Sequence, residues 1–173
     1  HYERGLEWYK RFFESSKQVE AVGEKSPSYM VTPKVPERIH DFNPRARLIF
    51  VFRDPVERAY SAYCMMLKAG EVGENVDKVI APGTRFVEEG LYFEHLDRFL
   101  QVFEEKQIKC LLYDDLQASP REFMQEVYSH IGVDPSFEPE LIEKKYHTRK
   151  TRPRFQNIYN ILVKCSKWVS GLG

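Results

Sequence analysis

Two short apolar runs, each bounded by charged residues or proline, stand out in the hydrophobic pattern of the chain. They cover residues 48–52 and 108–113, which is too short for helices of a globular protein. Apolar runs of this length are typical of strands that are buried on both faces of a parallel sheet. Residues 18–23, which include two valines, predict a further strand that ends near Gly23.

Amphipathic helices are predicted around these strands, because apolar residues recur there every three or four positions. The predicted helices cover residues 3–14, 33–42, 55–68, 91–103, 120–131 and 155–168. Asp54 is placed to cap one of them, Ser119 to Glu122 form a capping box before another, and Gly70 and Gly132 follow helix ends. The alternation predicts an α/β fold in a single domain over residues 1–173, with a parallel β-sheet flanked by helices.

The junction after the first apolar run places an arginine where α/β folds bind ligands. Arg53 follows the strand directly, and Asp54 and Pro55 begin the next helix. A helix amino terminus attracts anions, a guanidinium matches phosphate oxygens, and ligands of open sheets gather at the carboxyl ends of strands. The residues alone leave two interpretations open: an anion site at Arg53, or a structural ion pair of Arg53 with Asp54 or Glu57.

Composition narrows the class of protein without adding a site. The 26 basic and 26 acidic residues cancel, so no overall field recruits nucleic acid and an anion site has to be local. Cys64, Cys110 and Cys165 lack metal-ligand spacing, so we interpret them as buried or half-buried apolar side chains and expect no metal site. We find no apolar run of the roughly 18 residues that a membrane span requires and no signal peptide. Together with the sparse cysteines, this favours a cytoplasmic protein.

The strand-helix junction resembles a known family. Residues 48–63, LIFVFRDPVERAYSAY, resemble the segment of sulfotransferases that binds the 3′-phosphate of 3′-phosphoadenosine 5′-phosphosulfate (PAPS). An arginine and a serine hold the phosphate in that family, and Arg53 and Ser61 match them here. The resemblance implies a P-loop-like sulfotransferase fold that binds PAPS, or 3′-phosphoadenosine 5′-phosphate (PAP), as co-substrate.

A second segment is similar to the glycan-sulfating branch of that family, the heparan sulfate 3-O- and N-sulfotransferases. Residues 23–44 read GEKSPSYMVTPKVPERIHDFNP, and Lys25 matches a lysine at the reaction centre of that branch. A loop lysine is usually only solvated, but the resemblance implies a catalytic Lys25 that stabilises negative charge during sulfuryl transfer. Residues 111–133 also show a family pattern, and this favours a structural role for the paired acids Asp114 and Asp115.

A basic segment over residues 144–154, KKYHTRKTRPR, completes the predicted nucleotide site. A run of charge is usually a solvated face, but sulfotransferases close their nucleotide site with a basic loop at this chain position. The resemblance implies that Tyr146 matches an aromatic residue of that loop and that Arg149, Lys150 and Arg152 are phosphate ligands. The TKGF-like element of the glycan branch is absent from this segment.

The loop with which the family clamps the 5′-phosphosulfate has no counterpart in the sequence. Neither GxxxxGKS/T nor a KxGTT-like element occurs, and in the glycan branch that loop and the glutamate base precede the segment matching HYERGLEWY. We therefore expect the chain to begin after them, and we expect these residues alone to be nearly inactive.

The sequence thus predicts a sulfotransferase that moves a sulfuryl group from PAPS to a hydroxyl or amine of a carbohydrate-like acceptor. Residues 70–88 lack periodicity and are the predicted acceptor-recognition loop. His95 is interpreted as a hydrogen-bonded histidine at the edge of the core, and residues 155–168 as a helix that docks on the domain rather than on a membrane. A P-loop kinase-like protein and a noncatalytic glycan-binding relative stay open as alternatives, as does the Golgi lumen if the protein is eukaryotic.

Overall fold

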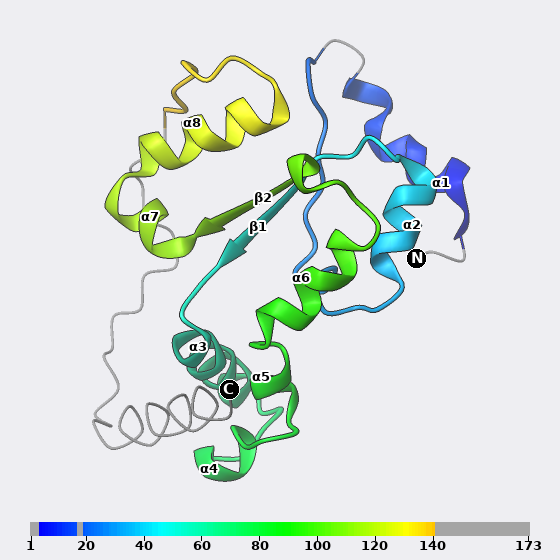
Figure 1. The fold of residues 1–173 in the computed structure, drawn as a ribbon. Helices are drawn as coiled ribbons and strands as arrows, with labels where there is room; N and C mark the ends of the chain where they lie inside the picture. The colour runs from blue at the N-terminus through cyan, green and yellow to red at the C-terminus, as the bar shows by residue number, and fades with distance from the viewer. Residues whose placement is uncertain (1–3, 17–18, 141–173) are drawn as a thin grey trace.

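Two parallel strands form the centre of the protein in a computed structural model that describes residues 4–16 and 19–140 (Figure 1). β1 (Leu48–Phe52) pairs with β2 (Ile108–Leu112) along their whole length. The other elements are α1 (Leu6–Lys10), η2 (Arg11–Ser16), α2 (Val35–Phe42), α3 (Pro55–Lys68), α4 (Val76–Val79), α5 (Arg85–Glu88), α6 (Tyr92–Leu100), η3 (Glu105–Gln107), α7 (Tyr113–Ala118) and α8 (Pro120–Ile131). The predicted parallel pairing and α/β class are confirmed.

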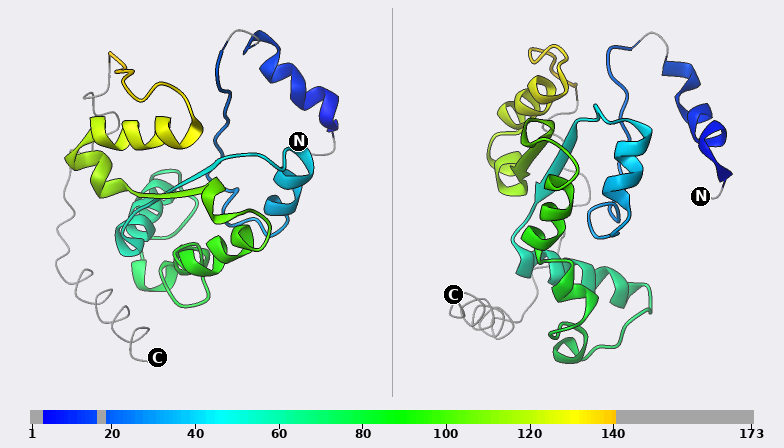
Figure 2. Two further views of the ribbon diagram at one scale, coloured as in Figure 1. Left: turned by 45° about the horizontal axis from the view of Figure 1, so that its top comes forward. Right: turned by 45° about the vertical axis from the view of Figure 1, so that its right-hand side comes forward.

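Helices lie on both sides of the two strands (Figure 2). On one side the ring of Phe99 in α6 meets that of Phe50 in β1 at 4.9 Å, in a core that includes Val35 of α2 and Phe103. On the other side α8 packs near β2, where Lys109 Nζ lies 2.7 Å from Glu126 Oε2. Burial of large aromatic side chains between helix and sheet therefore fixes the position of β1.

A second apolar cluster holds the stretch between α3 and α6. Ala59 and Tyr63 of α3 are buried together with Phe86 of α5, and the Tyr63 hydroxyl donates to the carbonyl of Glu74 at 2.8 Å. The aperiodic residues 70–88 thus contain two single-turn helices and pack on α3.

The expectation that both strands are buried on both faces is wrong for the described chain. Ile49 and Val51 of β1, and Cys110 and Leu112 of β2, are exposed. Alternate strand residues point to opposite faces, and α6 covers the Phe50 face of β1 whereas α8 covers the Leu111 face of β2. Each strand therefore has one covered face among the described residues. Cys110 is exposed and so is not the buried or half-buried side chain that we expected, whereas Cys64 is half-buried as expected.

Other local predictions need correction. Residues 19–23 form no strand, because the described sheet contains only β1 and β2 and gives this segment no ladder partner. The first predicted helix is a short α-helix that continues as a 3-10 helix. Ser119 precedes α8 but makes no capping side-chain bond, whereas Gly132 ends that helix with φ of 79° as expected. Phe42 of α2 and Leu100 of α6 are exposed apolar side chains. Residues 155–168 lie outside the described residues.

Candidate active site

Arg53 lies at the carboxyl end of β1 and is engaged by a neighbouring carboxylate. Its Nε and Nη2 donate to Glu57 Oε2 at 3.2 and 2.7 Å. The Arg53 side chain is 33% exposed and that of Glu57 is 58% exposed, so the ion pair lies at the surface and is screened by water. The structure therefore shows the ion pair of Arg53 with Glu57, one of the two interpretations that the sequence left open. A phosphate would have to compete with this exposed carboxylate for the guanidinium.

The amino terminus of α3 is occupied by its own cap. Asp54 Oδ1 accepts a hydrogen bond from the backbone N–H of Glu57 at 2.9 Å, and Pro55 has no N–H to offer. The predicted cap at Asp54 is confirmed. It also means that the helix end is less open to an anion than the sequence suggested, so an anion bound here would need side chains rather than the first turn as its ligands.

Two tyrosines from other elements surround Arg53. Its Cζ lies 5.4 Å from the ring centre of Tyr113, the residue that follows β2. Tyr92, the first residue of α6, packs its ring on Phe52 at 4.8 Å. Burial raises the pKa of Tyr92, opposed by the charge of Arg58 and by a hydrogen bond with the Arg53 backbone. Arg53 is thus flanked by two aromatic side chains. The sequence had placed Tyr113 in a predicted strand and Tyr92 in a predicted helix.

Ser61 shares a helix face with the carboxylate that holds Arg53. It is half-buried on α3, four residues after Glu57, and residues spaced by four lie one above the other on a helix. Glu57 and Ser61 therefore lie one helical turn apart on one face of α3, and Arg53, which precedes the helix, is joined to that face by its bonds to Glu57.

Lys25 projects from a loop that is braced on both sides. The Tyr29 hydroxyl donates to Glu24 Oε1 at 2.5 Å, and Thr32 Oγ1 donates to the carbonyl of Ser28 at 2.8 Å. Lys25 itself is exposed, and in the described part of the chain its ammonium has no hydrogen-bond or ion-pair partner. The loop is ordered by its own contacts while the ammonium stays free to meet a ligand.

Helix α6 joins the Lys25 loop to the Arg53 site. Arg98 in its last turn donates from Nη2 to the Met30 carbonyl at 3.1 Å, and Tyr92, its first residue, packs on Phe52, the residue before Arg53. Six residues of α-helix span roughly 9 Å, so the two predicted site segments attach to α6 about that far apart. The structure therefore gives a physical link between Lys25 and Arg53 that the sequence did not show.

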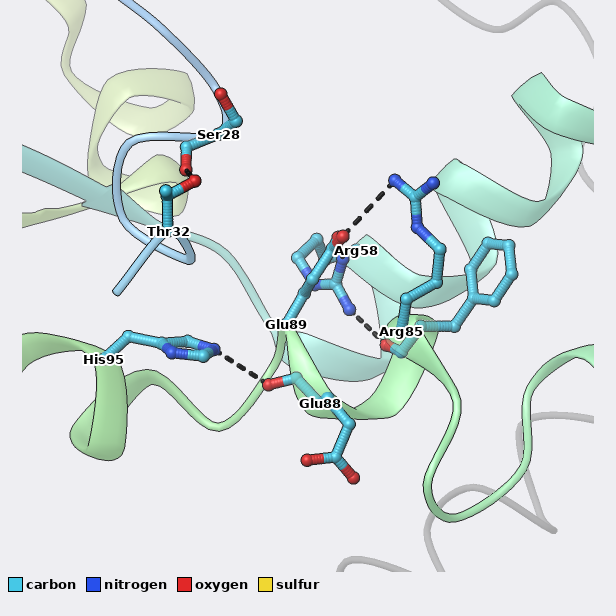
Figure 3. Close-up of polar contacts among 8 residues, drawn as sticks. Ser28, Thr32, Arg58, Arg85, Glu88, Glu89 and His95 are labelled. Atoms are coloured by element: carbon cyan, nitrogen blue, oxygen red, sulfur yellow. Dashed lines mark hydrogen bonds and ion pairs between the residues drawn. The ribbon is translucent and has the colours of Figure 1, made fainter. Parts of the chain in front are cut away.

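His95 bonds to Arg98 with one ring nitrogen and to the segment before α6 with the other. Arg98 Nη2 donates to His95 Nδ1 at 2.7 Å, so the ring hydrogen is on Nε2. The Nε2–H donates to the Glu88 carbonyl at 2.9 Å (Figure 3). The interpretation of His95 as a hydrogen-bonded histidine at the core edge agrees with this geometry.

Arg58 fastens the end of the predicted acceptor loop to α3 (Figure 3). Its Nη1 lies 3.0 Å from Glu89 Oε2, and its Nη2 donates to the carbonyl of Phe86. Gly90 permits this close approach, because a Cβ there would lie 3.2 Å from the Cβ of Pro55. Residues 85–90 are thus bound to the same helix that carries the predicted phosphate-binding serine.

Sequence reasoning missed the residues that hold the site together. Arg98 follows His95 by three positions on a predicted helix, a spacing that could have indicated a contact, whereas the partner of Arg58 is 31 residues away and left no local signal. Tyr146, Arg149, Lys150 and Arg152 lie outside the described residues.

Neither a metal site nor a membrane span is found in the described part of the chain. No group of three His, Cys, Asp or Glu side chains among residues 4–16 and 19–140 is arranged to hold a metal ion. None of the helices in those ranges has the length and apolar character needed to cross a bilayer.

Comparison with known proteins identifies relatives of this chain. The chain is 31% identical over 146 residues to heparan sulfate glucosamine 3-O-sulfotransferase 5 of Mus musculus, a match that covers 78% of this chain and 42% of that protein. It is 28% identical over 152 residues to bifunctional heparan sulfate N-deacetylase/N-sulfotransferase 4 of the same species, covering 79% and 17%. The chain spans about two-fifths of the 3-O-sulfotransferase that it matches.

A solved structure and a family match lead to the same conclusion. The fold matches the crystal structure of a sulfotransferase from Alicyclobacillus acidocaldarius with a TM-score of 0.78 at 24% identity, covering 94% of this chain and 66% of that one. The family model for the sulfotransferase domain matches residues 1–162. The chain therefore belongs to the sulfotransferase domain family.

Proposed function

We propose that this chain forms the part of a PAPS-dependent sulfotransferase that binds the 3′-phosphoadenosine end of the donor. The observation that carries the proposal is the position of Arg53, at the carboxyl end of β1 and one-third exposed, with Ser61 on α3 one helical turn after Glu57, the partner of Arg53. PAPS supplies an activated sulfuryl group when it is bound. Membership of the family, rather than the geometry alone, supports sulfuryl transfer over kinase-like chemistry.

Arg53 and Ser61 are the proposed ligands of the 3′-phosphate. The guanidinium leaves Glu57 to make charge-assisted bonds to the phosphate, and the Ser61 hydroxyl donates one more. Loss of the Glu57 pair costs little, because exposed ion pairs contribute only about 0–1 kcal/mol. Tyr146, Arg149, Lys150 and Arg152 are proposed to add contacts from the basic segment.

Lys25 is the proposed catalytic residue of this chain. Its exposed ammonium, on a loop braced by the Tyr29–Glu24 and Thr32–Ser28 bonds, is suited to stabilise negative charge that develops as the sulfuryl group moves. Since each lost electrostatic donor of this kind costs about 10²–10³ in rate, Lys25→Ala should lower kcat strongly and leave nucleotide affinity nearly unchanged.

The acceptor is proposed to be the hydroxyl or amine of a carbohydrate. The two relatives described above are named for heparan sulfate, and residues 70–88, fastened at their end by Arg58, are the proposed acceptor loop. A sulfate-transfer assay with a heparan sulfate oligosaccharide tests this on the present chain and on one extended at its amino end. Transfer by the extended chain that falls about 100-fold or more with Lys25→Ala supports the proposal, and no transfer from PAPS by either chain would overturn it.

A further inference from the structure

A pocket of about 500 Å³ lies at the amino ends of the two strands, at the opposite end of the sheet from Arg53. Arg47 directly precedes β1 and Gln107 directly precedes β2, and both line the pocket. The other lining residues are Pro44, Arg45, Glu104 and Lys106. Five strand residues span roughly 16 Å, so this pocket is separate from the proposed nucleotide site.

The wall of the pocket is held by the amide of Gln107. Its Nε2 donates to the carbonyls of Pro44 and Ala46 at 2.9 and 3.0 Å, and its Oε1 accepts the backbone N–H of Glu104 at 3.2 Å. The segments before β1 and before β2 are therefore tied together by one side chain. This wall of the pocket is therefore formed by the fold itself.

The charged side chains of the pocket are mostly positive. Lys106 Nζ lies 2.6 Å from Glu104 Oε2, and that pair is largely self-neutralised. Arg45 is exposed, its backbone N–H donates to Asn43 Oδ1 at 3.1 Å, and its guanidinium has no partner within residues 4–16 and 19–140. Two arginines thus remain as excess charge over the Lys106–Glu104 pair.

Arg47 is fixed in place by the end of α8. Its Nη1 donates to the carbonyl of His130, and a Cβ at Gly132 would lie only 2.7 Å from that nitrogen. Gly132, with φ of +79°, therefore leaves room for the guanidinium over this helix end, where a Cβ would force it to shift. Arg47 uses its Nη1 to bind the end of α8, so the guanidinium of Arg45 has more N–H donors available for a ligand.

We propose that this pocket binds a sulfate or carboxylate group of an anionic oligosaccharide, at a distance from the transfer site. The inference rests on the proposed function, which makes such a saccharide the acceptor. Its support is the excess of two guanidiniums, the preformed wall and a volume within the range of small-ligand pockets. The pocket would anchor a remote part of the acceptor chain and contribute affinity without touching the reacting atoms.

Calorimetric titration of the chain with a heparan sulfate hexasaccharide tests the proposal, with inorganic sulfate and an unsulfated neutral hexasaccharide as comparison ligands. Arg45→Gln is the test variant, because its guanidinium has no partner in the described chain whose loss would unfold the protein. Lys68→Gln, an exposed charge in the last turn of α3, is the matched control. Thermal unfolding of both variants verifies that they fold.

We expect the sulfated hexasaccharide to bind more tightly than the other two ligands. We expect Arg45→Gln to weaken it about ten-fold, as for loss of one charge-assisted hydrogen bond, and Lys68→Gln to leave it within about two-fold. Equal losses in the two variants, or inorganic sulfate that binds as tightly as the hexasaccharide, would overturn the proposal. Titration of the same samples with PAP measures the nucleotide site, which lies apart from this pocket. A failure of the proposed nucleotide site can therefore be told apart from a failure of the pocket.

Discussion

Arg58 and Arg85 provide a matched test of how the segment before α6 is held, because both guanidiniums pair with Glu89. Arg58 Nη1 lies 3.0 Å from Glu89 Oε2, and Arg85 Nη2 lies 3.3 Å from Glu89 Oε1. The Arg58 side chain is 20% exposed, whereas that of Arg85 is 63% exposed. The two arginines therefore share one carboxylate but differ in how far water screens the charge.

Replacement of Arg58 by methionine should cost about 2–4 kcal/mol of unfolding free energy. The change removes the bond to Glu89 and the bond to the Phe86 carbonyl, and each charged hydrogen bond contributes roughly 1.5–3 kcal/mol. The sum is reduced because Glu89 is 28% exposed and keeps its pair with Arg85. Arg85→Met removes one exposed pair and should cost only about 0–1 kcal/mol.

Urea unfolding of the two variants, followed by circular dichroism, measures this difference. Each variant loses one positive charge and gains the same methionine, so changes in net charge cancel between them. A cost for Arg85→Met equal to or larger than that for Arg58→Met would refute the reasoning that burial decides the strength of the pair.

Three further predictions concern the site and its surroundings. Glu57→Gln should tighten PAP binding up to about five-fold in calorimetry, because an exposed pair of about 1 kcal/mol no longer competes for Arg53; unchanged or weaker binding would contradict this. A hydrogen bond to Glu24 raises the pKa of Tyr29 from 10.0 to about 12. Between pH 10 and 12 the folded state therefore binds more protons than the unfolded state, so the unfolding free energy falls as the pH rises. Tyr29→Phe should lessen that fall when urea unfolding is measured across this pH range, and equal slopes of unfolding free energy against pH in the two proteins would disprove it. Gly90→Ala should lower the unfolding free energy by about 1–3 kcal/mol through overpacking, and an unchanged urea midpoint would exclude that contact.

The features that the sequence predicted well are those with a local physical cause. The apolar run before Arg53 and the cap at Asp54 need only neighbouring residues, and both occur as expected. The strand over residues 18–23 was wrong because a strand exists only with a partner, and no local pattern reveals whether one is present. Burial on both strand faces failed for the same reason, since it depends on helices from distant parts of the chain.

The candidate site shows the same division. Arg53 and Ser61 were predicted as ligands from one continuous segment, and the structure shows Glu57, the partner of Arg53, one helical turn before Ser61 on α3. The contacts of Arg98 with Met30 join residues 68 positions apart, and no local spacing rule predicts them. A structural ion pair of Arg53 with Asp54 or Glu57 was one of the two interpretations that the residues left open, and the three-dimensional contact shows the pair with Glu57.

Calorimetric titration with PAP and with adenosine 5′-monophosphate, which lacks only the 3′-phosphate, tests the central claim most directly. We predict that PAP binds more tightly than the monophosphate and that Arg53→Ala weakens PAP binding by about 1.5–3 kcal/mol while it leaves the monophosphate nearly unchanged. Equal affinity of the two nucleotides for the unaltered chain, or an Arg53→Ala variant that still prefers PAP to the same degree, would contradict the claim that Arg53 binds the 3′-phosphate.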